Sequence, residues 1–105
     1  MRNEEIEAVF KQCADIVDKK NSDYARPDDF YYNFRAVEDQ LSIPIWVGIC
    51  IRYLDKHSRL VNAVSQFNST GKMHLENENL EDTLIDGINY LALMLVTYRK
   101  WKNEK

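Results

Sequence analysis

The sequence predicts an all-α protein, a helical bundle of three long helices and one short helix. Two observations lead to this class. Apolar residues recur at steps of three and four along three long segments, as they do on one face of a helix. No stretch alternates between apolar and polar residues beside a hairpin turn, so no strand is expected. A chain of 105 residues is of a size that forms one domain, residues 1–105.

Composition and charge exclude several classes of protein. The net charge of −3 argues against a generally basic nucleic-acid-binding protein. Cys13 and Cys50 lie far apart without a CxxC motif, which excludes a zinc ribbon and a disulfide framework. No signal peptide is apparent, and the apolar runs are well short of the roughly 20 residues that span a bilayer. We therefore expect a cytoplasmic protein with neither a membrane nor a nucleic acid as its partner.

The first half of the chain is expected to hold one long and one short helix. The long helix runs from about Asn3 to Lys20, and the Asn3 side chain can cap it. A turn-rich segment, Lys19–Asp29, follows as the longest irregular stretch, because Pro27 disfavours helix at the residue before it. A short helix is expected over Asp28–Val37.

A second long helix is expected to begin at Ser42-Ile-Pro44, where the serine can cap the helix and the proline can occupy its first turn. It runs to about Phe67, and Asn68–Lys72 forms a loop. Near its start, Ile43–Ile51 is an apolar run.

The last helix can be capped by Asn77 or Asn79 and runs to about Lys102. From Ile88 to Val96 it is apolar nearly all round, which is typical of a buried helix. Together with the apolar run of the preceding helix, this is more apolar surface than a three-helix monomer can cover. We therefore expect a homodimer or a higher even oligomer.

Carboxylates line one side of this last helix. At about 100° per residue, Glu78, Asp82 and Asp86 fall, with Asn89, within an arc of about 80°. The opposite side is an apolar stripe, which consists of Leu80, Leu84, Ile88, Leu91, Leu95 and Tyr98. Because the carboxylate side continues into apolar residues one or two turns further on, we expect something to cover it.

The preceding helix carries a strip of opposite charge. Arg52, Lys56 and Arg59 lie on one narrow arc, with Asp55 at its edge. This arc continues backwards into the apolar run. Burying charge is costly unless the charges are paired or bound to a metal ion.

Two interpretations of the charged strips remain open. In one, the strips form a salt-bridge network between the helices, in which Arg59 pairs with Asp82 or Asp86. In the other, the three carboxylates, which repel one another, hold a divalent cation, and oxygen ligands favour Mg²⁺ or Mn²⁺.

Four motifs follow one another along the chain: Lys20-Asn-Ser-Asp23-Tyr24-Ala25, Asn33-Phe34-Arg35, Asp55-Lys56-x-x-Arg59, and Glu78-x-x-x-Asp82-Thr83-Leu84-x-Asp86-x-x-x-Tyr90. In order and spacing they resemble small phage proteins of the nucleotide-modification-associated family. That family is similar to the all-α nucleoside triphosphate pyrophosphohydrolases of MazG type. The resemblance spans about residues 5–98 and implies an oligomeric helical domain that binds Mg²⁺ through carboxylates and cleaves or binds a nucleotide.

The resemblance assigns roles to particular residues. The reaction would be Mg²⁺-dependent hydrolysis of a nucleoside triphosphate to a monophosphate and pyrophosphate, in the cytoplasm of the host cell of a phage. The metal ligands would be Glu78, Asp82 and Asp86. The catalytic group would comprise Asp55, Lys56 and Arg59, and the substrate-binding group Asp23, Tyr24, Asn33 and Arg52.

The basic strip favours an alternative to hydrolysis. Proteins of MazG type carry a paired ExxE on the helix that precedes the ExxD helix, whereas this chain has Asp55 among three basic residues. The alternative is a catalytically silent nucleotide-binding oligomer, for example one that sequesters a signalling nucleotide in host defence. A third interpretation is a purely structural oligomeric module in which the charged strips are salt bridges.

Overall fold

Four helices form the part of the chain that the computed structural model describes, which comprises residues 2–24, 32–72 and 79–104, without the side chains of residues 21–24, 32, 33 and 37. They are α1 (Glu4–Tyr24), α2 (Tyr32–Leu41), α3 (Ile45–Thr70) and α4 (Leu80–Asn103). The described ranges contain no strand, so the predicted all-α class is confirmed. None of the helices in these ranges combines the length and hydropathy that crossing a membrane requires.

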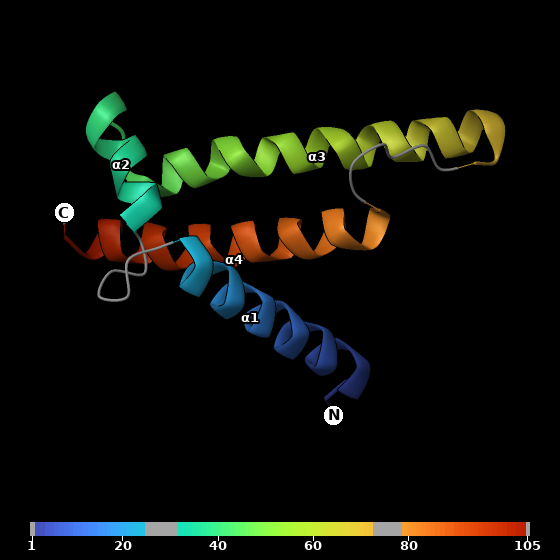
Figure 1. Ribbon diagram of the computed structural model, residues 1–105, viewed down its shortest axis with the longest axis horizontal. Coiled ribbons are helices and arrows are strands. Elements are labelled where there is room, and N and C mark those ends of the chain that lie inside the picture. The colour runs from blue at the N-terminus through green and yellow to red at the C-terminus, as the bar shows by residue number, and fades with distance from the viewer. Residues whose placement is uncertain (1, 25–31, 73–78, 105) are drawn as a thin grey trace.

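An antiparallel hairpin of α3 and α4 is the centre of the fold (Figure 1). The short helix α2 packs against α3, and α1 crosses α4 obliquely, so that its N-terminal half points away from the hairpin. At the end of the hairpin near α2, Trp46 of α3 lies 5.5 Å from the rings of both Tyr98 and Trp101 of α4. This arrangement leaves three long helices that meet around the middle of α4.

The core between the helices is small. Among the described residues, the buried apolar side chains are Cys13, Ile49 and Ala63, and the buried polar residues include Thr83 and Thr97. The Thr97 hydroxyl donates to a backbone carbonyl one turn earlier, at 2.9 Å, so this polar group is satisfied within its own helix. Burial raises the pKa of the Cys13 thiol, because the charged thiolate would lose its hydration where α1 docks.

The N-termini of α1 and α4 are capped by side chains that the sequence predicts as caps. The backbone N–H of Ile6 donates to the Asn3 side chain at 3.0 Å, and that of Asp82 donates to the Asn79 side chain at 2.8 Å. Each cap satisfies an N–H that the first turn leaves without an intrahelical acceptor. The predicted cap Asn3 is therefore confirmed. Of the two candidates for the last helix, Asn77 and Asn79, it is Asn79 that caps α4.

The prediction that Ser42 caps the following helix is wrong. Pro44 occupies the N-cap position of α3 and makes no side-chain cap. Ser42 instead has φ 54°, in the left-handed region, and the N–H of Ile43 donates to the carbonyl of Glu38 at 3.2 Å. This bond spans five residues, as in a Schellman motif, so Ser42 ends α2 rather than beginning α3.

Three other boundaries also differ from the prediction. α1 continues to Tyr24 through residues that the sequence assigns to a turn, α2 begins four residues later than expected, and α3 continues to Thr70. Asn, Ser and Asp disfavour a helix interior only slightly, so α1 continues until a stronger signal stops it. α3 ends only at Gly71, whose φ of 75° suits glycine and whose N–H donates to the carbonyl of Phe67 at 2.8 Å.

Candidate functional site

Asp86 lies at the junction of three helices and contacts two lysines. The Lys20 ammonium of α1 is 2.8 Å from Asp86 Oδ1, and the Lys56 ammonium of α3 is 3.2 Å from Asp86 Oδ2. The side chains of Asp86 and Lys56 are each 15% exposed, whereas that of Lys20 is 56% exposed. We call these three residues the lysine–aspartate cluster. Its formal charge is +1, because two ammonium groups share one carboxylate.

Small and polar residues of α4 bring Asp86 close to α3. Gly87 has no side chain, and a Cβ there would lie 3.9 Å from the Tyr53 ring of α3, which is ordinary contact distance. One turn earlier, Thr83 is buried. α3 can therefore approach this part of α4 closely, and Asp86 and the buried Asn89 lie on a covered face, as the sequence predicts.

The pairing of Arg59 with Asp82 or Asp86 that the salt-bridge interpretation proposes is wrong. Asp86 pairs with Lys56 and Lys20, while the Arg59 Nε lies 3.4 Å from Asp55 Oδ2 on its own helix. Asp55 is exposed, and Asp82 is exposed one turn from Asp86. The acidic strip is thus covered at Asp86 but exposed at Asp82.

Arg52, the third basic residue of the strip on α3, contacts α2. Its guanidinium lies 5.0 Å from the centre of the Phe34 ring, within the range of a cation–π interaction. Asn33 precedes this phenylalanine on α2, and Asp23 and Tyr24 end α1, but the side chains of these three residues lie outside the described part of the structure. Glu78 also lies outside it.

Lys20 was missed as a site residue. The sequence places it at the end of the first helix, next to a turn. The continuation of α1 instead puts Lys20 on the face that already carries Cys13, Ile16 and Val17, at steps of three and four. This face packs against α4. The periodicity of the first helix therefore indicates that Lys20 faces α4. Lys20 was overlooked because the predicted helix ended at that residue.

The carboxylates of α4 meet only part of what a divalent metal ion requires. Asp82 and Asp86 are one turn apart on α4, a spacing that can serve one ion. However, Lys20 donates a hydrogen bond to Asp86 Oδ1 and Lys56 forms an ion pair with Asp86 Oδ2. The described residues also contain no group of three or more side chains of His, Cys, Asp or Glu placed to hold a metal. A metal ion at Asp86 would therefore have to displace a lysine, and its third predicted ligand is Glu78.

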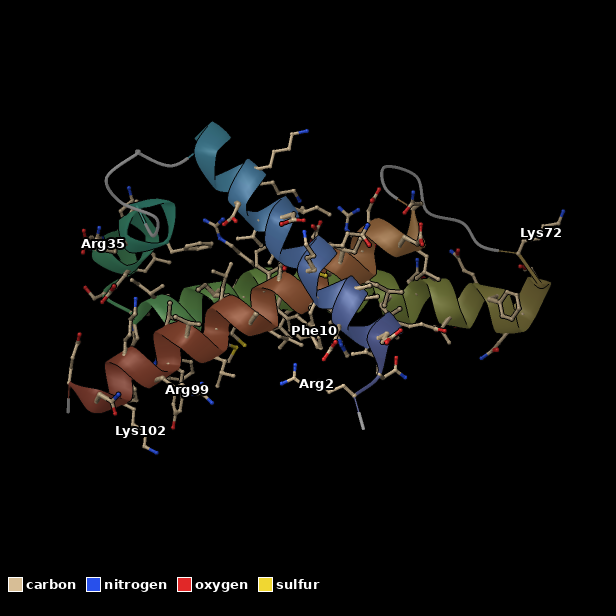
Figure 2. All side chains as sticks on the ribbon, turned by 90° about the horizontal axis from the view of Figure 1, so that it is seen from below. Arg2, Phe10, Arg35, Lys72, Arg99 and Lys102 are labelled. Atoms are coloured by element: carbon tan, nitrogen blue, oxygen red, sulfur yellow. The ribbon has the colours of Figure 1, made fainter. Side chains whose placement is uncertain are left out.

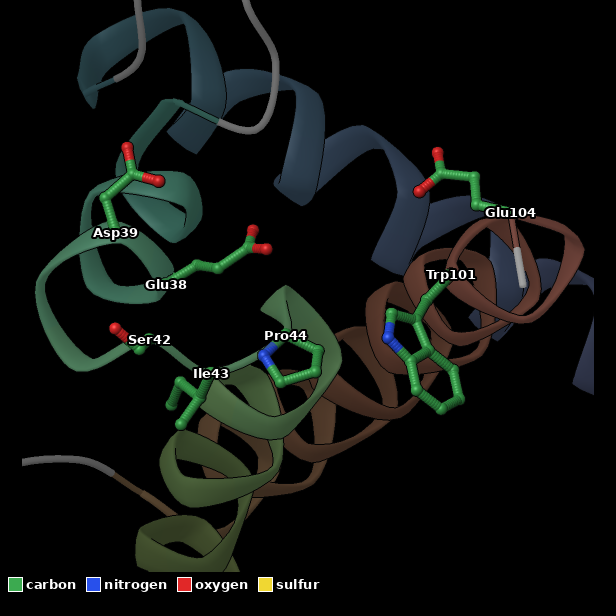
Figure 3. A pocket seen from close by; sticks show the side chains of 7 residues that line it. All are labelled: Glu38, Asp39, Ser42, Ile43, Pro44, Trp101 and Glu104. Atoms are coloured by element: carbon green, nitrogen blue, oxygen red, sulfur yellow. The ribbon is translucent and has the colours of Figure 1, made fainter.

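A hollow of about 530 Å³ lies at the other end of the hairpin, between α2 and the end of α4. Figure 3 shows Glu38 of α2 on one side of it and Glu104, after α4, on the other, with Trp101 nearby. Asp39 is the third carboxylate of its lining, and none of the described residues that line it is basic. Its charge would repel phosphate, so the lysine–aspartate cluster is the better candidate for an anion.

No family model, curated protein or solved structure matches the chain. The resemblance to the nucleotide-modification-associated family therefore rests on the four sequence motifs.

Proposed function

We propose that this protein binds a nucleotide through its phosphates at the lysine–aspartate cluster. The observation that supports this proposal is the pair of ammonium groups, from α1 and α3, that meet at one carboxylate. A phosphate group offers several oxygens with more negative charge than the carboxylate carries. It can accept from both lysines at once, in charge-assisted hydrogen bonds.

The surroundings of Lys56 strengthen this interaction. At 15% exposure, the Lys56 side chain is poorly screened by water, so a phosphate beside it gains more electrostatic energy than at an exposed lysine. Arg52 and Arg59 lie one turn before and one turn after it on α3, and both are partly buried. The site would thus supply guanidinium groups for further phosphate oxygens.

Hydrolysis of a nucleoside triphosphate to monophosphate and pyrophosphate is the enzymatic form of this proposal. Asp82 and Asp86, with Glu78, would hold Mg²⁺ or Mn²⁺, which when bound polarises phosphates and lowers the pKa of a water molecule. The exposed ion pair of Lys20 supports this form, since Lys20 can leave Asp86 at little cost. Lys56 and Arg59 would neutralise the phosphates, and Asp55 would lie at the edge of the site.

Binding without hydrolysis is the second form, and different contacts favour it. Both oxygens of Asp86 are engaged by lysines, and Asp55 is paired with Arg59. The groups on α3 that face a ligand are therefore cations rather than metal-binding carboxylates. In this form the protein would sequester a nucleotide, in the cytoplasm of the host cell if a phage encodes it.

A panel of nucleoside triphosphates, with Mg²⁺, with Mn²⁺ and without a divalent ion, tests the proposal. We expect calorimetric binding of at least one nucleotide, weakened about tenfold or more in Lys20→Gln and Lys56→Gln, which corresponds to about 1.4 kcal/mol per lysine. Lys11→Gln is the matched control, because Lys11 also forms an ion pair on α1, 2.9 Å from Asp15. Release of pyrophosphate would identify the enzymatic form. Absence of binding across the panel would overturn the proposal.

Self-association is part of the same proposal. Large apolar side chains remain exposed on all three long helices, among them Phe10 of α1, Ile51 of α3 and Leu91 of α4. Scattered exposed apolar residues are ordinary, but contiguous ones mark an interaction surface. We infer that the protein forms a homodimer or a higher even oligomer.

A further inference from the structure

One side of α4 carries an apolar stripe that the described helices leave largely exposed, although Tyr98 at its end packs edge-on against Trp46 of α3. The stripe consists of Leu84, Ile88, Leu91, Leu95 and Tyr98, and we call it the α4 stripe. Its residues follow steps of four, three, four and three, the spacing of a coiled-coil seam, and at about 100° per residue they fall within about 80°. Leu84 is 43%, Leu91 47%, Leu95 48% and Tyr98 38% exposed.

The other sides of α4 are occupied. α3 covers the side that includes Gly87, which faces Tyr53 at contact distance. α1 reaches the side of Asp86 through Lys20 at 2.8 Å. Asp86 lies on the opposite side of the helix from the α4 stripe, at about 160° from its centre. The stripe is therefore a third side of α4, separate from the proposed nucleotide site.

We propose that the α4 stripe packs against the α4 stripe of a second copy of this chain, with the two helices antiparallel and Leu91 near the two-fold axis. This inference rests on the self-association proposed above and names its surface. A symmetric dimer uses the same patch on both copies, and a narrow apolar seam is complementary to itself.

The charges beside the stripe determine the antiparallel direction. Glu81 lies beside its N-terminal end, and Arg99 and Lys102 project at its C-terminal end (Figure 2). An antiparallel pair centred on Leu91 places Glu81 of each copy next to Arg99 and Lys102 of the other. A parallel pair would place like charges side by side, and it would also align the two helix dipoles unfavourably.

The surface that the chain exposes is large enough for such an interface. Its solvent-accessible surface is 8055 Å², against about 6100 Å² for a compact monomer of this mass. Its radius of gyration is 15.8 Å, against about 13 Å for a compact domain of this length. The excess surface, roughly 1900 Å², is comparable to what each copy contributes to a large homodimer interface.

Light scattering during size-exclusion chromatography tests the inference, with Leu91→Glu as the probe. The matched control is Ile51→Glu, because Ile51 is 56% exposed on α3, on the side away from α4. We expect the wild type and Ile51→Glu to be dimers or larger, and Leu91→Glu to have the monomer mass of 12.4 kDa with unchanged helical circular dichroism. We also expect Leu91→Glu to bind nucleotide as the wild type does.

Other results would separate a wrong contact surface from the absence of self-association. If only Ile51→Glu dissociates the oligomer, self-association stands and the α4 stripe is the wrong surface. If the wild type is a monomer at micromolar concentration, self-association and the stripe both fail, while nucleotide binding is judged by its own assay.

A cross-link tests the direction and the axis. With Cys50 replaced by serine and Cys13 buried, Leu91→Cys presents one accessible thiol. Because residue 91 of the two copies would face one another across the axis, we expect rapid formation of a covalent dimer under mild oxidation. Ile51→Cys in the same background should remain monomeric on a denaturing gel. In the same background, Leu84→Cys tests the direction, because an antiparallel pair places residue 84 opposite residue 98 and leaves this variant monomeric, whereas a parallel pair would cross-link it and overturn the antiparallel arrangement. A covalent dimer that forms equally from Leu91→Cys and Ile51→Cys would overturn the position of the axis.

Discussion

Asp86 has two lysine partners, but the two ion pairs lie in different surroundings. The ammonium of Lys56 reaches Asp86 within the contact of α3 and α4, where both side chains are 15% exposed. The ammonium of Lys20 reaches Asp86 from the solvent side. Water screens an exposed pair, so its loss costs little. Loss of the covered lysine leaves the Asp86 carboxylate poorly hydrated and with one fewer positive charge beside it, which costs more.

Replacement of each lysine by methionine, which keeps most of the apolar stem, separates these two contributions. We expect Lys56→Met to lower the free energy of unfolding by about 2 kcal/mol, less than for a buried pair without a second partner. Lys20→Met should lower it by less than about 1 kcal/mol, as should Lys11→Met on the surface of α1. Urea denaturation measures all three. Equal losses for Lys20 and Lys56 would contradict this difference.

The residue types of the site could be predicted more easily than their partners. Asp86 and Lys56 were identified because their helical spacing puts them on charged strips that continue into apolar residues. The choice of lysine over Arg59 as the partner of Asp86 depends on how far α3 slides along α4, which periodicity does not determine. Asp55 and Arg59 pair within one helix, at the separation of four residues that favours such pairs.

At the level of the helices, capping side chains were predictable and helix ends were less so. Asn3 and Asn79 act through their own side chains on the next turn, so a short stretch of sequence contains the whole interaction. Ser42 is different, because its left-handed conformation depends on how α2 meets α3. A serine before Ile-Pro fits an N-cap equally well, and only the tertiary arrangement decides between the two roles.

The left-handed ends of α2 and α3 give a prediction with an internal control. Ser42, at φ 54°, pays a steric cost that glycine avoids, so Ser42→Gly should raise the free energy of unfolding by about 0.5–1 kcal/mol. Gly71, at φ 75°, is the reverse case, and Gly71→Ala should lower it by a similar amount. A Cβ at Gly71 would meet nothing within 4 Å, so this cost is due to the backbone alone. Thermal denaturation of both variants checks the opposite signs.

At the scale of the whole molecule, the sequence predicted more apolar surface than a monomer covers. The structure places the α4 stripe on a side that α1, α2 and α3 leave exposed. Periodicity identified this stripe and the acidic strip opposite to it. It predicted that the acidic strip is covered but could not say whether another helix of the chain or a second copy covers it, because an amphipathic helix can bury one face within its own chain and the other against a partner.

The two forms of the proposed function assign Asp86 different roles, which nucleotide binding without and with a divalent ion separates. If phosphates bind to the lysines, Asp86 competes with them for the same ammonium groups. Removal of its charge then raises the formal charge of the cluster from +1 to +2 and removes the carboxylate that competes with the ligand for both ammonium groups. If Asp86 is chiefly a metal ligand, its removal eliminates the Mg²⁺ response. Asp82, exposed one turn away, contacts neither lysine in the described structure and shares only the second role.

Asp86→Asn and Asp82→Asn therefore form a matched pair for the last prediction. Without a divalent ion, we expect Asp86→Asn to bind nucleotide about tenfold more tightly than the wild type, because one opposing charge a few ångströms away has been removed. Asp82→Asn should bind as the wild type does. With Mg²⁺, both variants should lose part of the ion's stabilising effect, which for a wild-type protein at 100 times the dissociation constant is about 2.7 kcal/mol. Melting curves with and without nucleotide and Mg²⁺ measure these effects. Weaker metal-free binding by Asp86→Asn would show that the carboxylate positions the lysines for the phosphate rather than competing with it.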